Sequence, residues 1–289
     1  MTVNVSENAE KPLLKRRSRR ATGQEVIPVP TSRLARKAMH DKLFAEMFGP
    51  EHEPKLVFPP RIRNRTSRGK FPTAKYAAGR SIRTRNMLMD DGLVILDTDP
   101  DIIALAPYPM VIRYEGIDVD GLVSWQEHVP DLAAIRRNGR VEFIDFVSDL
   151  DASSNWLLVR SRLIAAALHR DYGVVYKVLP AAWVRKQPRF RNRNLMWAHA
   201  PSPYQPAVIG NLARQILEQP LPMSIGDLRA SLDRNVMVSR EEGEPPTASQ
   251  PITGSDVVFT ACMQLAFAGK VCVDMGDRPI DAMIVGRRA

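Results

Sequence analysis

The chain has 289 residues, with 41 Lys and Arg against 32 Asp and Glu, and a formal net charge of +9 at pH 7. A chain of this length can bury one sizeable core and a second, smaller one. Its apolar runs are too short to span a membrane, and no apolar segment follows the first basic run as a signal peptide requires. We therefore expect a cytoplasmic protein with no membrane partner. The cysteines Cys262 and Cys272 lie in an apolar segment, which favours small, reduced core residues over a disulfide or a metal site.

The positive charge is concentrated near the N-terminus. Residues 1–89 hold 20 basic and 7 acidic residues, a charge of +13, whereas the remainder holds 21 basic and 25 acidic residues, a charge of −4. The run from Pro54 to Met89 contains no acid, and aromatic residues interleave with its basic ones. This pattern favours a surface that follows nucleic-acid phosphates over a merely solvated face. The residues that we expect to contact DNA are Arg61, Arg63, Arg65, Arg68, Lys70, Lys75, Arg80, Arg83 and Arg85.

The first part of the chain divides into a tail and a folded segment. Residues 1–30 are polar, charged and interrupted by proline, so we expect a disordered basic arm. Apolar periodicity predicts helices over 32–48 and 81–96, with irregular chain over 51–80 between them. Short strands are then expected over 102–107, 110–114 and 119–124.

A β-hairpin, a long helix and a further strand complete the predicted core, 31–182. Residues 132–135 and 141–147 form the two strands of the hairpin, joined by a turn with the sequence Arg-Asn-Gly-Arg. Ser153-Ser154 predicts the start of a helix over 155–171, and 174–179 is an apolar strand of the buried type. Together these elements predict an α/β domain in which helices flank a mixed sheet.

The C-terminal part has the pattern of a smaller domain. A basic linker is expected over 183–204, and the C-terminal domain over 205–289. Its expected elements are helices over 205–219, 225–233 and 256–268, a strand over 271–274 and a return strand over 284–285. Three helices and a hairpin are the outline of a winged helix, although a generic helical domain fits the same pattern. The last helix carries no Lys or Arg, which favours contact with a protein over contact with DNA.

One motif has the outline of a nuclease metal site. Pro130-Asp131 stands at the start of one hairpin strand, and Asp145 lies on the next. Hydrolysis of a phosphodiester uses one or two Mg²⁺ ions, which bind carboxylate oxygens, so Asp131 and Asp145 are the candidate metal ligands and catalytic residues. A lysine two residues after the second acid would orient or deprotonate water, but Val147 stands there. Taken alone, two such aspartates more often end a strand or face solvent.

Four further segments bear on the interpretation. They are Phe71-Pro72-Thr73-Ala74-Lys75 with Arg80-Ser81-Ile82, the run Leu93–Ile102 with its Asp99-Pro100, Pro109–Tyr114 after Tyr108, and His128-Val129-Pro130-Asp131-Leu132. In order and spacing they resemble the N-terminal nuclease domain of the TnsA family, the endonuclease subunit of heteromeric transposases. The resemblance runs from Lys70 to Leu179, with Tyr108 in place of the family's Gln. Residues 205–289 resemble the winged-helix domain through which that family contacts its ATPase regulator.

The resemblance implies a restriction-endonuclease-like fold and a Mg²⁺-dependent nuclease that nicks transposon ends beside a DDE transposase. It assigns the metal-binding acids to Asp131 and Asp145, the helix Glu to the position of Met89, and the lysine to the position of Val147. Two of the four positions therefore depart from the family's pattern. Asp90 or Asp91 could replace the Glu with a shift of register, and Arg160 or Arg162 could reach inward as a cation, although arginine is a poor base.

These departures lead to one expected function and two alternatives. The expected function is a transposition protein that binds transposon-end DNA, the DDE transposase and, through its C-terminal domain, the AAA+ ATPase regulator, with weak or lost nuclease activity. The first alternative is an active endonuclease with a rearranged site, and only then is Mg²⁺ expected as a cofactor. The second alternative is a non-catalytic DNA-binding regulator.

Overall fold

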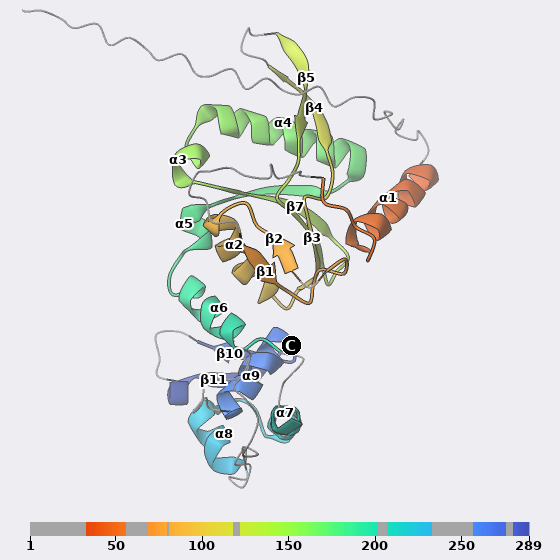
Figure 1. The fold of residues 1–289 in the computed structure, drawn as a ribbon. Coiled ribbons are helices and arrows are strands. Elements are labelled where there is room, and N and C mark those ends of the chain that lie inside the picture. The colour runs from red at the N-terminus through yellow and green to blue at the C-terminus, as the bar shows by residue number, and fades with distance from the viewer. Residues whose placement is uncertain are drawn as a thin grey trace, which may run out of the picture.

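The computed structural model describes residues 33–55, 69–79, 81–117, 122–201, 207–232, 257–275 and 280–288 of the chain. It is a mixed α/β protein in which helices pack around several small sheets (Figure 1). Within the described ranges, no helix is both long and apolar enough to cross a membrane. The expected basic arm, residues 1–30, lies outside the described residues.

The central sheet has four strands in the order β3-β6-β7-β8. Its strands are β3 (Ile102–Pro107), β6 (Leu132–Arg136), β7 (Val141–Val147) and β8 (Val175–Pro180). β3, β6 and β7 are antiparallel neighbours, whereas β7 and β8 run parallel. A parallel pair needs a crossover, and here the helix α4 (Asn155–Tyr172) supplies it. The predicted hairpin is confirmed, including its turn, where Gly139 has φ +80°.

Helices cover both faces of this sheet, because the side chains of β7 alternate between two cores. Ile144 and Phe146 pack with the helix α2 (Met87–Asp97), whereas Val141 and Phe143 pack with α4. Figure 1 shows α2 and α4 on opposite sides of the sheet. The helix α1 (Arg33–Phe48) also packs on the α4 side, through Met47.

The start of α2 differs from the prediction of one helix over 81–96. Residues Ser81–Arg83 form the strand β2, which pairs with β1 (Lys70–Pro72), and α2 begins at Met87. Asn86 sets that start, because its side chain accepts a hydrogen bond from the Met89 amide. The segment 84–86 is therefore a bend between strand and helix, and it includes Arg85.

A second hairpin stands beside α4. It consists of β4 (Ile112–Ile117) and β5 (Val123–His128), which pair antiparallel from Ile112 opposite His128 to Ile117 opposite Val123. Both strands begin later than the predicted 110–114 and 119–124. This register places His128, the last residue of β5, close to the start of β6.

The stretch predicted as a linker, 183–204, is largely helical. After the short α3 (Asp149–Ala152) and α5 (Ala181–Val184), the helix α6 (Arg189–Ala198) runs towards the C-terminal part. Trp197 of α6 stacks on Phe71, with ring centroids 5.1 Å apart, so this basic helix packs on the N-terminal core through its apolar residues.

The C-terminal part forms its own core. Its elements are α7 (Ala207–Glu218), β9 (Met223–Ser224), α8 (Ile225–Ser231), α9 (Val257–Phe267), β10 (Val271–Asp274), the 3-10 helix η1 (Ile280–Ala282) and β11 (Ile284–Arg287). The sheet order is β10-β11-β9, and α9 packs almost entirely within the core. Cys262 is buried there as predicted, but Cys272 is exposed, because its side chain alternates with that of the buried Val271 on β10.

Candidate functional site

Asp131 and Asp145 lie side by side at the edge of the central sheet. Their strands pair with Leu132 opposite Ile144, which brings the residue before β6 next to Asp145 on β7. The Asp131 amide donates to Asp145 Oδ1 (2.9 Å), and the Phe146 amide donates to Asp131 Oδ2 (2.8 Å). Only 3% of Asp131 and 6% of Asp145 is exposed, so each charge needs partners within the protein.

Arg85 is the partner of Asp131. Its Nε lies 2.7 Å from Oδ1, and its Nη2 lies 2.7 Å from Oδ2. Nη2 also donates to the backbone carbonyl of Phe146. Nη2 donates the hydrogen bond and Nε contributes a close ion pair, so the guanidinium places a fixed positive charge directly against the buried carboxylate.

Asp145 has a different set of partners. His128 Nε2 lies 2.6 Å from Asp145 Oδ2, and the Tyr176 hydroxyl donates to the same oxygen. On the far side of the imidazole, Arg160 Nη2 lies 2.7 Å from His128 Nδ1, and Arg160 Nε donates to the Tyr114 hydroxyl (3.1 Å). A guanidinium can only donate, so Nδ1 accepts and the proton of His128 sits on Nε2, directed at Asp145.

The two carboxyl groups are held in different electrostatic environments. Burial raises the pKa of Asp131, the nearby Asp145 raises it further, and Arg85 opposes both effects. Burial also raises the pKa of Asp145, but hydrogen bonds from His128 and Tyr176 outweigh it, and the net pKa is lowered. The pKa of Tyr176 is raised by burial and by the adjacent Asp145, so the phenol stays a hydrogen-bond donor.

These residues do not fit a Mg²⁺ site. All four carboxylate oxygens of Asp131 and Asp145 already accept hydrogen bonds or ion pairs from protein groups. Magnesium needs unencumbered oxygens at about 2.0–2.1 Å in octahedral geometry. Over the ranges that the structure describes, no group of three or more His, Cys, Asp or Glu is arranged to hold a metal ion. The cation beside Asp131 is the guanidinium of Arg85.

Met89, at the position of the helix Glu, and the expected substitutes Asp90 and Asp91 all lie away from the pair or bind other residues. Met89 is fully buried, and the Tyr108 hydroxyl lies 3.3 Å from its sulfur. Asp90 hydrogen-bonds Thr84, and burial raises its pKa. Asp91 pairs with Arg185, with Arg185 Nε 2.7 Å from its carboxylate. No carboxylate of α2 therefore joins the Asp131–Asp145 pair through any described contact.

Val147 opens onto a cleft next to the pair. The cleft has a volume of about 450 Å³ and is lined by Arg85, Val147, Arg185 and the first turn of α2. Arg85 thus has two sides, one bound to Asp131 and one that forms part of the cleft wall. Arg160, a predicted substitute cation, lies behind His128 and contacts Asp145 only through that imidazole.

The predicted DNA-contacting residues divide into three groups. Lys70 and Arg83 are exposed and face each other across the β1–β2 hairpin. Lys75 and Arg85 are engaged inside the protein, since the Lys75 ammonium donates to carbonyls at the end of α2, including Asp99 O at 2.8 Å. Burial lowers the pKa of Lys75 to about 8. The remaining five, Arg61, Arg63, Arg65, Arg68 and Arg80, lie outside the described residues.

The sequence did not identify Arg85 and Tyr176 as the partners of Asp131 and Asp145. Arg85 was assigned to DNA because it ends an acid-free basic run, and Tyr176 lies within an apolar strand. No local sequence signal identifies Tyr176, because its contact with Asp145 depends on how β8 pairs with β7.

Comparisons with known proteins do not assign this site. The chain matches no protein-family model, and a search of curated proteins finds no match for it.

Proposed function

We propose that this protein is a DNA-binding subunit of a transposition complex, with a nuclease-like core that does not cleave DNA. The observation that carries the proposal is the two-point contact of Arg85 with Asp131. A protein guanidinium supplies the charge that a metal ion would supply to this carboxylate. It holds the acid in place, but it provides no metal-bound water for hydrolysis.

The restriction-endonuclease-like fold is part of this proposal. A central sheet with an aspartate at the start of β6 and an acid on the adjacent β7 supports it. So does the parallel strand β8, which follows the crossover helix α4. Val147 and the buried Met89 then occupy the places of the lysine and the helix Glu, and both changes remove groups that hydrolysis uses.

Double-stranded DNA is the partner that best fits the charge distribution. Residues 1–89 carry a charge of +13, and Lys70 and Arg83 extend this charge onto an exposed hairpin next to Arg85. Lysines and arginines that neutralise phosphates release counterions and make binding depend on salt. Lys75 is not one of these phosphate contacts, because its ammonium binds carbonyls at the end of α2.

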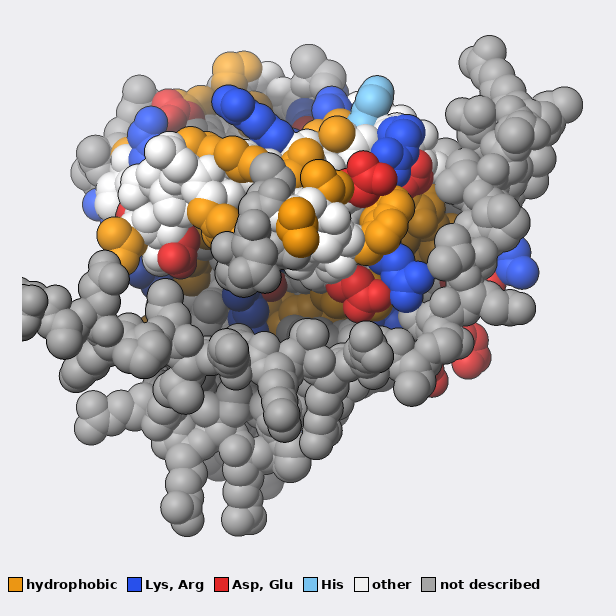
Figure 2. Space-filling model, turned by 90° about the horizontal axis from the view of Figure 1, so that it is seen from above, with side chains coloured by type: hydrophobic (Ala, Val, Ile, Leu, Met, Phe, Trp, Pro, Cys, Tyr) orange, Lys and Arg blue, Asp and Glu red, His pale blue; other side chains and the backbone are white. Residues whose placement is uncertain are grey.

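A partner protein is supported by two other features. The order helix, strand, two helices and hairpin, with the sheet order β10-β11-β9, supports a winged-helix-like C-terminal domain. We assign to it the contact with an AAA+ ATPase regulator rather than with DNA, because α9 carries no basic residue and is buried in the core of this domain, so it offers no DNA-reading helix. Exposed apolar residues on β5 and α4, including Trp125 and Trp156, support contact with the DDE transposase. Figure 2 shows, from above, hydrophobic side chains lying among basic and acidic ones.

The test is a strand-specific nicking assay on transposon-end duplex, with the partner transposase present and with Mg²⁺ or Mn²⁺. We expect a stable complex and no metal-dependent product. A product that disappears in Asp131→Ala would show that Arg85 moves aside and that the protein is an active endonuclease. Binding is measured in parallel over a range of salt, comparing Lys70→Gln with Arg113→Gln, a charge change on β4. If residues 205–289 alone bind duplex specifically, the regulator alternative replaces the transposition proposal.

A further inference from the structure

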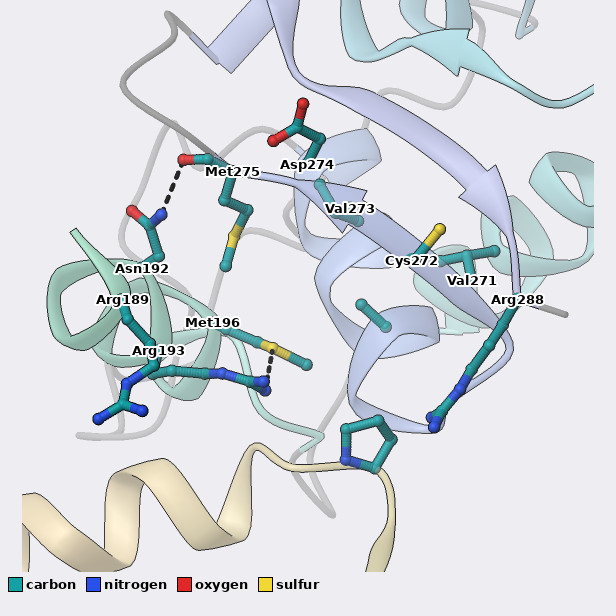
Figure 3. A pocket seen from close by; sticks show the side chains of 12 residues that line it. Arg189, Asn192, Arg193, Met196, Val271, Cys272, Val273, Asp274, Met275 and Arg288 are labelled. Atoms are coloured by element: carbon teal, nitrogen blue, oxygen red, sulfur yellow. Dashed lines mark hydrogen bonds between the residues drawn. The ribbon is translucent and has the colours of Figure 1, made fainter. Parts of the chain in front are cut away.

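A second pocket lies between the two cores, away from Asp131. It has a volume of about 410 Å³ and is bounded by α6, β10 and Pro100 in the loop after α2 (Figure 3). Its apolar wall is formed by Pro100, Met196, Ala266, Val271 and Val273. Pockets for small molecules are typically of this size, mostly apolar, and situated between domains.

Arginines provide most of the charge of this pocket. Arg189 and Arg193 come from α6, Arg288 follows β11, and Asp274 is the one acid among the described residues that line the pocket. In Figure 3, Arg193 and Arg288 extend towards each other from opposite sides of the pocket. Arg193 Nη1 donates to the Thr98 carbonyl (2.5 Å), so the side chain is held in place by the end of α2.

Gly269 creates the space that Arg288 occupies. A Cβ at this position would lie 2.9 Å from Arg288 Nη1 and 3.0 Å from Pro100 Cβ, and the residue has φ +70°. Arg288 Nη2 in turn pairs with Asp101 at 2.5 Å. The guanidinium is therefore anchored by one nitrogen, and its other terminal nitrogen stays beside the pocket.

Two of these guanidinium groups have donors that are not used. Arg288 Nη1 and Arg189 Nε are buried and make no hydrogen bond within the part of the chain that the structure describes. A buried donor without a partner costs free energy that a bound acceptor recovers. Burial lowers the pKa of Arg193, and this effect outweighs the nearby Asp99, which raises that pKa; Arg189 lowers it further.

We propose that this pocket binds a nucleoside phosphate, with the phosphate between Arg193 and Arg288 and the base against Met196 and Val271. An isolated phosphate ion would leave most of the apolar wall uncovered, whereas a base covers it. Because the pocket is built from α6, β10 and the loop after α2, the ligand would tie the C-terminal core to the nuclease-like core. This proposal is independent of DNA binding by the N-terminal basic run.

The experiment uses the full chain and isothermal titration with AMP, ATP, adenosine and inorganic phosphate. We expect a nucleotide to bind and raise Tm, adenosine to bind far more weakly, and phosphate alone to fall between them. Arg288→Gln is expected to weaken nucleotide binding by about tenfold or more, since it removes one charge-assisted contact. Arg193→Gln should do the same, and its Tm without ligand reports whether the loss of the Thr98 contact has disturbed the fold.

The matched control is Arg191→Gln, which makes the same charge change on α6 at an exposed residue that does not line the pocket. We expect it to leave nucleotide affinity unchanged. The proposal is overturned if no nucleotide binds, or if Arg191→Gln and Arg288→Gln weaken binding equally. It is also overturned if Arg288→Gln weakens binding of duplex DNA while free nucleotides do not bind, because the pocket would then belong to the DNA interface.

Discussion

The guanidinium of Arg85 binds the carboxylate of Asp131 through two nitrogens, each 2.7 Å from its oxygen. The two residues are 46 positions apart, and their contact joins the bend before α2 to the start of β6. Asp131 is almost completely buried, whereas about 38% of the Arg85 side chain is exposed, on the side of the cleft. The same residue thus neutralises the core carboxylate and presents positive charge to solvent.

Replacing Arg85 should destabilise the protein, because among the described residues Asp131 then keeps only the Phe146 amide as a partner of its carboxylate. Removing one partner of a buried pair costs about 3–5 kcal/mol, and we expect Arg85→Gln to fall at the lower end, about 3 kcal/mol, because water can enter from the cleft. Urea unfolding measures this change. Arg113→Gln is the control, since its pair with Glu127 is about two-fifths exposed and should matter by less than about 1 kcal/mol.

The double variant Arg85→Gln with Asp131→Asn tests whether the loss comes from the unpaired charge. If it does, the second change recovers much of the free energy lost by the first, and the two effects are far from additive. Additive losses would mean that Arg85 acts through packing of its aliphatic stem, and the electrostatic account of the site would be wrong.

The stability of the folded state should depend on pH through Asp131. Burial, the nearby Asp145 and the opposing effect of Arg85 together raise the pKa of Asp131 from 3.8 to about 7. Between these values the folded state binds more protons than the unfolded state, so the contribution of Asp131 to the free energy of unfolding falls as pH rises through this window. The readout is the difference in unfolding free energy between the wild type and Asp131→Asn at several pH values. A difference that stays constant from about pH 4 to about pH 7 would contradict the raised pKa.

Much of the central sheet could be predicted, because its signals are local. The β-branched and aromatic residues of Val141–Val147 and the Asn138-Gly139 turn predict the hairpin as the structure has it. The boundary between β2 and α2 was missed, although Asn86 before an apolar run is a capping signal. The helix α6 was missed because its charged residues outweigh the aromatic face, here Trp197, that packs on the core.

The candidate site could be predicted only in part, because its partners come from distant segments. The proximity of Asp131 and Asp145 follows from pairing within one hairpin, which sequence spacing indicates. The contacts of Arg85, His128 and Tyr176 depend on how separate elements pack, and no local pattern encodes them. An arginine in a basic run looks the same in sequence whether it binds DNA or a buried carboxylate.

The arrangement of Arg160, His128 and Asp145 predicts a single tautomer of the imidazole. Because Arg160 donates to Nδ1, the proton should sit on Nε2. Nitrogen-15 NMR of the histidine-labelled protein at neutral pH should show a protonated Nε2 and an unprotonated Nδ1 for His128. Arg160→Leu removes the donor and should shift the Nδ1 resonance, whereas Arg162→Leu, an exposed change on the same helix, should leave it in place. A protonated Nδ1 in the wild type would contradict the hydrogen-bond assignment.

Gly92 in α2 should resist substitution, because the ring of Phe146 fills the space beside it. A Cβ at this position would overlap with the ring atoms of Phe146. Phe146 is only 1% exposed, so its ring cannot move outward to relieve the overlap. We expect Gly92→Ala to lower the free energy of unfolding by about 1–3 kcal/mol, because overpacking exceeds the gain in helix propensity. Gly210 in α7 is the matched control, since a Cβ added there would meet no atom within 4 Å. There the same change should stabilise the protein by up to about 1 kcal/mol, and equal effects at both glycines would contradict the packing of α2 on β7.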